Sequence, residues 1–487
     1  MQCAFEVALK DLRDAGCATV IVQSTGLLTL HLQPTAPADL GTLPQAAITC
    51  HQYLKLKSGD LALVNDPSSG SFSMNTFTCV TAASLPDGDL LLAARFDTPR
   101  RLSASGKPDD EGVRVPPMPM ATKKVLNRDL LSAISMHPLA VPDLVSKIEH
   151  TSNLLFEAAR KLEALARTAG SGFDQAGFEG YLTDSSTAFE TSIAKLPLGT
   201  AIVSGRVLGS NEVVKLTLEL SEKHVQFDFK GTEPSSKVGL TEITTFGTCV
   251  WSVLALLGEP VPLTSSVLGH FQVSAPTNTL LATRAQVSLE RGVSLVVPLL
   301  GELIHQALAK VNPNLKSAST AGTSALAQLE FADGRTLFLT SSPGAGALSG
   351  QKGQDAFGAW NAVAQSSLEK HEASMPVTWS AAGLSKGTGG KGIKRGGEAE
   401  LIACRLREPA KLRWLLGRSS VRIEGQAGGK AGSVAELEIV RADGTRESFK
   451  TLEGLADVAA GDEIRLHAAG GGGWGDYDTA KEKEKKD

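Results

Sequence analysis

The residues of this chain that could do chemistry are few and scattered. Its nine histidines form no H-x-H or H-x-x-x-H pair and no tight cluster with carboxylates, which is the usual pattern of a metal site. The nearest match to a phosphate-binding loop, Gly390-Lys391-Gly392, has Ser385 where the first glycine of the motif belongs. Generic motifs therefore do not define a function.

One string fits the G-x-S-x-G pattern of a nucleophile elbow, at residues 383–387. Such an elbow needs a strand before the serine and a helix after it. Because Ser385 stands in a glycine-rich stretch, we interpret the string as a loop. The glycines of the last third, in 383–397, 425–432 and 470–476, favour structured turns and close backbone approach over a merely flexible chain.

Composition sets wide limits on function. The chain has 487 residues, 42% hydrophobic and 21% charged, with a net charge of −4, so it has room for several domains and no basic balance for nucleic acid. Six dispersed cysteines and the lack of a signal-peptide pattern favour the cytoplasm. The longest apolar run, near residues 293–308, is interrupted by Pro298, Glu302 and His305 and is too short for a membrane span.

Periodicity indicates a mixed fold. Apolar residues recur at steps of three and four between residues 127 and 197, which predicts helices, and further helices are expected over 245–257 and from Pro298 onward. Alternation over 201–230 predicts a β-hairpin with one buried face, and Asp-Gly turns at 333–334 and 443–444 predict two more.

We expect an α+β protein with a helical insertion and a glycine-rich β part at its C-terminal end. The expected divisions are an N-terminal α/β part (1–125), a helical segment (126–197), a central α/β core (198–410), a C-terminal β part (411–478) and a disordered charged tail (479–487).

Five segments, in order, resemble the hydantoinase B family, which includes 5-oxoprolinase and the acetone carboxylase alpha-type subunit. They are 59-GDLALVNDPSSGSF-72, 111-EGVRVPPMPM-120, 227-FDFKGTEP-234, 387-GTGGKGIKRGG-397 and 461-GDEIRLHAAGGGGWGD-476. Each is short, but five in the same order across the chain are a strong signal.

The resemblance implies a subunit of an ATP-dependent complex that opens a cyclic amide, or of an acetone-carboxylase-type complex that activates a ketone. The chain would then be a hydrolase acting on C–N bonds, and a hydantoinase A-like partner would bind ATP and magnesium, so no cofactor is expected in this chain. Phosphorylation of the amide oxygen makes it a leaving group before water attacks, which overcomes a slow hydrolysis. Neither a nucleic acid nor a membrane is an expected partner.

The same resemblance places a His and an Asp, three residues apart, in the loop after N-D-P, and a paired-histidine stretch further on. Imidazole and carboxylate together suit a zinc-type or manganese-type ion. This chain has Ser73 and Thr76 at the first two places and 93-AARFDTPRRLSASG-106 in place of the histidine pair. We therefore expect a degenerate metal site. The chain also starts at 3-CAFEVALKDLRDAG-16, where family members have a longer lead-in.

The residues near the expected substrate cleft are Asn65, Asp66, Arg95, Lys391 and Arg395. Asp66, before Pro67, could act as a base or simply start a turn. Arg95, with Arg100 and Arg101, could bind an anion, or could be a surface arginine paired with Asp97, Asp109, Asp110 and Glu111.

Lys391 and Arg395 could hold an anion or be solvated turn charges. Three hypotheses for the whole chain stay open. It is a catalytic subunit, a non-catalytic scaffold or regulatory homologue that binds an A-type partner, or a metal-free enzyme whose glycine loops bind an anionic substrate.

Overall fold

The structure is a computed structural model that describes residues 2–25, 29–86, 88–169, 174–234, 237–257, 260–284, 287–358, 360 and 368–476. The tail expected to be disordered, 479–487, lies outside these residues. The chain forms two compact units: residues 1–203 with 214–293, and residues 204–213 with 294–487. The first is called unit 1 and the second unit 2. The five-part division expected from the sequence stays a prediction.

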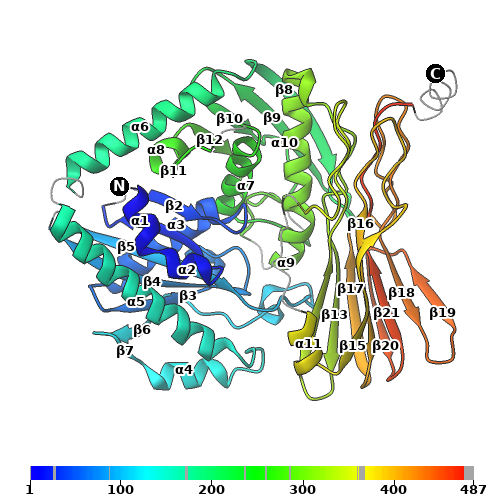
Figure 1. Ribbon diagram of the computed structural model, residues 1–487, viewed down its shortest axis with the longest axis horizontal. Coiled ribbons are helices and arrows are strands. Elements are labelled where there is room, and N and C mark those ends of the chain that lie inside the picture. The colour runs from blue at the N-terminus through cyan, green and yellow to red at the C-terminus, as the bar shows by residue number, and fades with distance from the viewer. Residues whose placement is uncertain are drawn as a thin grey trace. The chain divides into compact units, whose positions relative to one another are not determined.

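Unit 1 is built on an eight-stranded sheet in the order β11-β2-β1-β5-β4-β3-β6-β7 (Figure 1). Its strands are β1 (Ala18–Gln23), β2 (Thr29–Gln33), β3 (Leu61–Val64), β4 (Thr76–Leu85), β5 (Gly88–Asp97), β6 (Met118–Thr122), β7 (Val125–Leu126) and β11 (Leu263–Thr264). The paired strands whose registers are resolved run antiparallel.

Both faces of this sheet are covered, so its central strands are largely apolar. Leu61 and Leu63 of β3 face a core shared with α1 (Gln2–Ala8), α2 (Lys10–Asp14) and α5 (Leu144–Ala169). Ala62 and Val64, one residue out of step, face a second core under α3 (Asp39–Leu54). Successive side chains of a strand point to opposite faces, and burial on both faces removes any polar alternation.

The helices expected between residues 127 and 197 are confirmed as α4 (Arg128–Ser135), α5 and α6 (Gln175–Ile193). The helix expected over 245–257 is α7 (Glu242–Leu254), which starts three residues earlier because Thr241 caps it through a hydrogen bond from the Thr244 amide.

A four-stranded sheet, β12-β10-β9-β8, follows α6 in the chain. Its strands are β8 (Gly199–Arg206), β9 (Val213–Leu220), β10 (Val225–Asp228) and β12 (Phe271–Ser274). Strands β9 and β10 form the hairpin predicted from the period-two pattern, with Leu220 opposite Val225. A four-residue helix, α8 (Ser265–Leu268), precedes β12.

The helix expected from Pro298 is confirmed as α10 (Val297–Val311), with Pro298 in its first turn. It continues from α9 (Leu289–Arg291) through a π-helical turn over residues 292–296. Together Leu289–Val311 is the one helix among the described residues that is long and apolar enough to cross a membrane, with a mean hydropathy of 1.5. Since 78% of its most apolar stretch is buried, it has the character of a core helix.

Unit 2 contains two sheets that share one core. The first, β14-β13-β17-β20, comprises β13 (Ala325–Phe331), β14 (Thr336–Ser341), β17 (Ala410–Leu416) and β20 (Glu453–Val458). The second, β15-β16-β21-β18-β19, comprises β15 (Val377–Ser385), β16 (Ala399–Leu406), β21 (Glu463–His467), β18 (Glu436–Val440) and β19 (Arg446–Phe449). A short helix, α11 (Leu368–Ser374), precedes β15. Both Asp-Gly hairpins are confirmed, as β13–β14 and β18–β19. The helices and separate sheets together confirm the expected α+β class.

The glycine-rich stretches of unit 2 are ordered and pack backbone against backbone. Gly471 donates to the Gly397 carbonyl at 3.0 Å and accepts from the Gly390 amide at 2.8 Å. A Cβ added to Gly471 would lie 1.9 Å from the Ala345 carbonyl oxygen, and one on Gly396 would lie 2.0 Å from the Gly471 oxygen. The glycines are there because no side chain fits between these segments.

The cysteines that can be assessed, Cys17, Cys50, Cys79, Cys249 and Cys404, are free and buried. They contribute apolar volume to the cores rather than cross-links. Localisation in the cytoplasm stays a prediction.

Candidate functional site

Asn65 stands at the end of β3 and is completely buried. Its amide nitrogen donates to the Met74 carbonyl at 2.8 Å and to the Val113 carbonyl at 2.6 Å. Its amide oxygen accepts from the Val115 backbone N–H at 2.6 Å. Asn65 therefore joins three chain segments, and its side chain is used up in holding the loops together.

Asp66 begins a short 3-10 turn, η1 (Pro67–Ser69), and is partly exposed. Its carboxylate accepts from the Ser68 amide at 3.0 Å, which is the bond of a turn-initiating aspartate. The turn closes on Gly70 at φ +104°, where an added Cβ would lie 2.4 Å from the Ala46 nitrogen of α3. The turn role proposed for Asp66 accounts for this geometry.

The hydroxyls of the following loop are bonded to each other and to the loop backbone. Ser71 Oγ lies 2.7 Å from Thr76 Oγ1, and Thr76 Oγ1 donates to the Ser73 carbonyl at 3.0 Å. Ser73 Oγ accepts from the Asn75 amide at 3.2 Å. All three residues are buried. The loop is thus internally satisfied where the family resemblance places a His and an Asp.

These residues do not fit a zinc-type or manganese-type ion. Neutral hydroxyl oxygens are poor substitutes for imidazole and carboxylate, and those of Ser73 and Thr76 already serve the loop. Across the part of the chain that the structure describes, no group of three or more His, Cys, Asp or Glu residues could hold a metal ion.

Arg95 on β5 is in the interior, with 2% of its surface exposed. Its guanidinium donates to Asp39 Oδ1 at 2.8 Å, Thr42 Oγ1 at 2.7 Å, Thr78 Oγ1 at 2.9 Å and the Gly70 carbonyl at 2.8 Å. The interpretation of Arg95 as a surface arginine paired with nearby downstream carboxylates is wrong. Its partner is Asp39 at the start of α3, and its fork is committed to that internal pair.

The Phe72 ring completes the surroundings of Arg95, with the guanidinium carbon 5.3 Å from the ring centroid. Burial lowers the pKa of Arg95, and the adjacent Asp39 carboxylate opposes that shift. Since Arg95 contacts both Gly70 and Phe72, the buried ion pair fixes the same loop that carries Ser71, Ser73 and Thr76.

Glu111 links the 111–120 segment to the start of α9. It is fully buried, and its carboxylate accepts from the Ser288 hydroxyl, from the Leu289 amide at 3.2 Å and from the Glu290 amide. Burial raises the pKa of Glu111 to about 8, although its hydrogen bonds act in the opposite direction. Arg100 was also expected to pair with nearby carboxylates, and it pairs instead with Glu290 of α9 at 3.0 Å.

Lys391 and Arg395 belong to unit 2, whereas Asn65, Asp66 and Arg95 belong to unit 1. Both side chains are exposed. Arg395 forms an ion pair with Glu398, which is buried and accepts from the Thr388 amide at 2.7 Å. The structure brings together Asn65, Asp66, Ser73, Thr76 and Arg95 within unit 1. The anion-binding role of Lys391 and Arg395 stays a prediction.

Ser385 is the last residue of β15, so a strand does precede it, contrary to the expected loop. The chain then passes to β16 through residues 386–398, which contain no helix. Its hydroxyl lies 3.3 Å from His467 Nδ1. A strand–turn–strand does not form a nucleophile elbow.

Sequence reasoning missed Asp39, Ser288 and Glu290. Asp39 has one local signal, which is its position in the first turn of α3, where an acidic residue is favourable. Its carboxylate accepts the backbone amides of Thr35 and Ala36, just before the helix, both at 2.9 Å. Nothing local indicates its pairing with Arg95, or that of Glu111 with Ser288.

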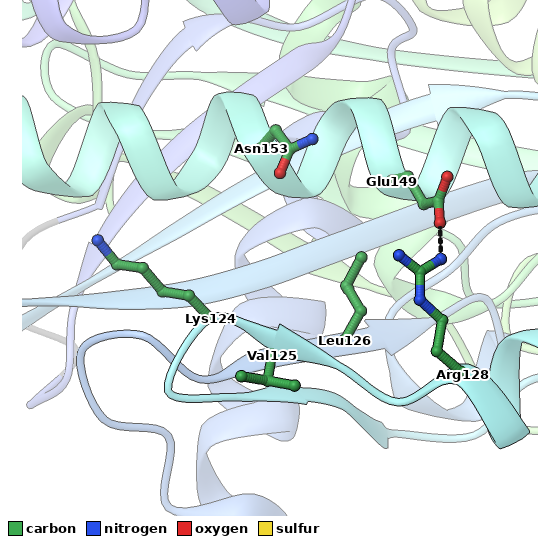
Figure 2. A pocket seen from close by; sticks show the side chains of 6 residues that line it. All are labelled: Lys124, Val125, Leu126, Arg128, Glu149 and Asn153. Atoms are coloured by element: carbon green, nitrogen blue, oxygen red, sulfur yellow. Dashed lines mark hydrogen bonds and ion pairs between the residues drawn. The ribbon is translucent and has the colours of Figure 1, made fainter.

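A hollow of unit 1, about 500 Å³, lies elsewhere, between the β6–β7 hairpin and α5 (Figure 2). Arg128 reaches across it to an ion pair with Glu149. It is lined by Lys124, Val125, Leu126, Arg128, Glu149 and Asn153. None of the residues predicted from the sequence to be functional lines it.

The fold is shared with two solved enzymes. An ATP-dependent caprolactamase from Pseudomonas jessenii superposes with a TM-score of 0.81 at 16% identity, over 97% of this chain and 89% of that one. A nucleotide-free acetone carboxylase superposes with a TM-score of 0.79 at 11% identity, over 98% of this chain and 73% of that one. The chain thus shares its fold with a caprolactamase and an acetone carboxylase.

The chain belongs to the hydantoinase B/oxoprolinase family, whose sequence profile matches residues 1–477. The 5-oxoprolinase of Saccharomyces cerevisiae is 23% identical over 96% of this chain and 39% of its own length. 5-Oxoprolinase 1 of Arabidopsis thaliana is 22% identical over 55% of this chain and 21% of its own length. The chain therefore spans about two fifths or less of these relatives.

Proposed function

We propose that this chain is the hydantoinase B-class subunit of an ATP-dependent complex that opens a cyclic amide. The observation that carries the proposal is the family match across residues 1–477, joined to a caprolactamase-like fold over 97% of the chain. The 5-oxoprolinase and caprolactamase names both refer to enzymes acting on cyclic amides, which favours such a substrate over a ketone.

The proposed chemistry is divided between two chains. A hydantoinase A-like partner binds ATP and magnesium and transfers the terminal phosphoryl group to the amide oxygen, releasing ADP. Water then adds to the activated carbon, and the ring C–N bond breaks to leave a free amine and an acyl phosphate. A second water hydrolyses the acyl phosphate to a carboxylate and inorganic phosphate. The lack of a phosphate-binding loop in the sequence fits this division.

The proposal includes a degenerate metal site in this chain. Ser73 and Thr76 support it, because their hydroxyls are spent on the loop and neither offers an imidazole or a carboxylate. The chain would contribute a shaped, hydrogen-bonded scaffold for the substrate rather than a Lewis acid.

A non-catalytic role is the second candidate, and the contacts of the predicted site residues favour it. Asn65, Asp66 and Arg95 each have a structural use, as a loop anchor, a turn cap and a buried ion-pair partner. A scaffold or regulatory homologue that binds an A-type partner would keep all three without turning over a substrate.

One experiment separates the two candidates. The chain is purified with a co-expressed hydantoinase A-class protein, and ADP release is measured with 5-oxoproline, hydantoin or caprolactam against the partner alone. The catalytic proposal predicts ADP release that depends on one of these amides and on both chains. Stable complex formation without any amide-dependent ADP release would support the scaffold role instead.

Asp66→Asn tests the role of the turn carboxylate in an active complex. As a turn cap, the substitution should leave the turnover number within a few-fold of the parent. As a general base it should lower turnover by about 100-fold or more. Asp60→Asn is a matched control, because Asp60 also accepts a backbone amide in a turn, from Lys57 at 3.1 Å.

A further inference from the structure

A small cavity in unit 2 has the features of a ligand site that is independent of the proposed activity. It lies between β8 and α10, has a volume of about 170 Å³, and is lined on one side by Leu295, Leu299 and Leu303. Cavities of about 150 Å³ hold a molecule of six heavy atoms. The available space therefore suits a small organic molecule.

Charged side chains line the same cavity. Arg418 forms an ion pair with Glu302, and these side chains are 16% and 15% exposed. Gln306 donates to Glu302, so the carboxylate is held from two sides. Arg206, exposed on β8, also lines the cavity and bonds to Asn211 at 3.1 Å. Two guanidinium groups and one carboxylate leave an excess of one positive charge.

The Arg418 guanidinium has a donor that the protein does not use. Its Nε is buried and, among the described residues, has no hydrogen-bond partner. A buried N–H without an acceptor is destabilising, and more so when the group is charged. The Arg418 guanidinium, which lines the cavity, is therefore not saturated by contacts within the protein.

The backbone holds Arg418 in an uncommon conformation. Its φ is +63°, in the left-handed region that residues with a side chain seldom adopt. The preceding Gly417 packs so closely on Thr323 that an added Cβ would lie 2.2 Å from the threonine hydroxyl. Thr323 also lines the cavity, so this strained turn presents Arg418 to it. Strain of this kind is concentrated at functional sites.

We propose that this cavity binds a small aliphatic monocarboxylate. Its carboxylate would face the guanidinium groups of Arg418 and Arg206, and its alkyl chain would lie against Leu295, Leu299 and Leu303. The excess positive charge favours an anion over a neutral amide, and the leucines favour an alkyl chain over a polar one. Because the Glu302 carboxylate already pairs with the Arg418 guanidinium, the remaining positive charge balances only one ligand carboxylate.

The test is calorimetric titration of the full-length protein with 3-methylbutanoate, which has seven heavy atoms, and with 3-methylbutanamide as its neutral counterpart. A ligand of this size is expected to bind with a dissociation constant of about 1 mM. The amide should bind at least tenfold more weakly. No saturable binding of the carboxylate, or equal binding of the amide, would overturn the proposal.

Ser204→Trp locates the binding without disturbing the Arg418 pair. Ser204 is exposed on β8 and lines the cavity, so an indole there fills it. Ile202→Trp, two residues earlier and 68% exposed, is the matched control outside the lining. With both variants unfolding at the parental temperature, Ser204→Trp should abolish binding and Ile202→Trp should leave it intact. Binding that survives Ser204→Trp would place the ligand elsewhere and reject the site.

Discussion

Replacing Arg95 by methionine should severely destabilise unit 1. The variant loses four hydrogen bonds, and it leaves Asp39 without its cation at a place where both side chains are at most 1% exposed. Asp39 Oδ2 keeps its bonds from Thr35 and Ala36, so the carboxylate stays in place. Breaking a buried pair from one side costs about 3–5 kcal/mol.

The magnitude can be checked by differential scanning calorimetry, with amide hydrogen exchange in β4 and β5 assigning the transition to unit 1. A loss of this size lowers the unfolding temperature of such a unit on the order of 10 °C. Arg160→Met is the control, because Arg160 and Glu157 form an exposed pair, 58% and 53% accessible, whose loss should leave the unfolding temperature nearly unchanged.

A second substitution isolates the charge. Adding Asp39→Asn to Arg95→Met removes the uncompensated anion and should recover about 1–3 kcal/mol. A loss below about 1 kcal/mol for Arg95→Met, or a double variant less stable than the single one, would refute the reasoning that this pair anchors the loop.

Three further predictions follow from single side chains. Gly471→Ala should destabilise or misfold unit 2, because the new Cβ would lie 1.9 Å from the Ala345 oxygen. Gly180→Ala, on α6 with no atom within 4 Å of the new Cβ, should instead stabilise unit 1 by about 1 kcal/mol. Thermal unfolding tests both variants, and equal effects would contradict the packing argument. Asn65→Leu should cost about 2–4 kcal/mol by denaturant titration, because two carbonyls and one amide lose their partner; a loss within about 0.5 kcal/mol would exclude the anchor role. The pKa of Glu111 is raised from 4.5 to about 8, so the folded state binds more protons than the unfolded state between these values. The contribution of Glu111 to stability is present below pH 4.5 and is lost as the pH rises to 8. The unfolding temperature of the parent should therefore fall relative to that of Glu111→Gln over this interval. Unfolding temperatures of the two proteins that change in parallel with pH would contradict this prediction.

Elements with a local signal could be predicted from the sequence. Steps of three and four marked α5, and the Asp-Gly turns marked the β13–β14 and β18–β19 hairpins, because these patterns involve neighbours in the chain. Strand order could not be predicted, since both faces of the large sheet are buried and its strands carry no polar alternation to indicate a face.

The site was predictable only as a set of segments. The ordered motifs identified the Asn65 loop and the 111–120 run, but the bonds that join them cross long stretches of chain. Arg95 and Asp39 are 56 residues apart, and Glu111 and Ser288 are 177 residues apart. Pairings at such separations leave no trace in spacing or periodicity, so neither alternative considered for Arg95 included a buried pair with Asp39.

The most direct test of the account is the metal content of a complex that turns over a cyclic amide. The chain is purified with its A-class partner, shown to release ADP in response to the amide, and analysed for zinc, manganese, iron, cobalt and nickel by mass spectrometry. The account predicts turnover with these metals far below one equivalent per chain, magnesium being supplied with ATP. One equivalent of such a metal, whose removal abolishes turnover and whose return restores it, would contradict the degenerate site.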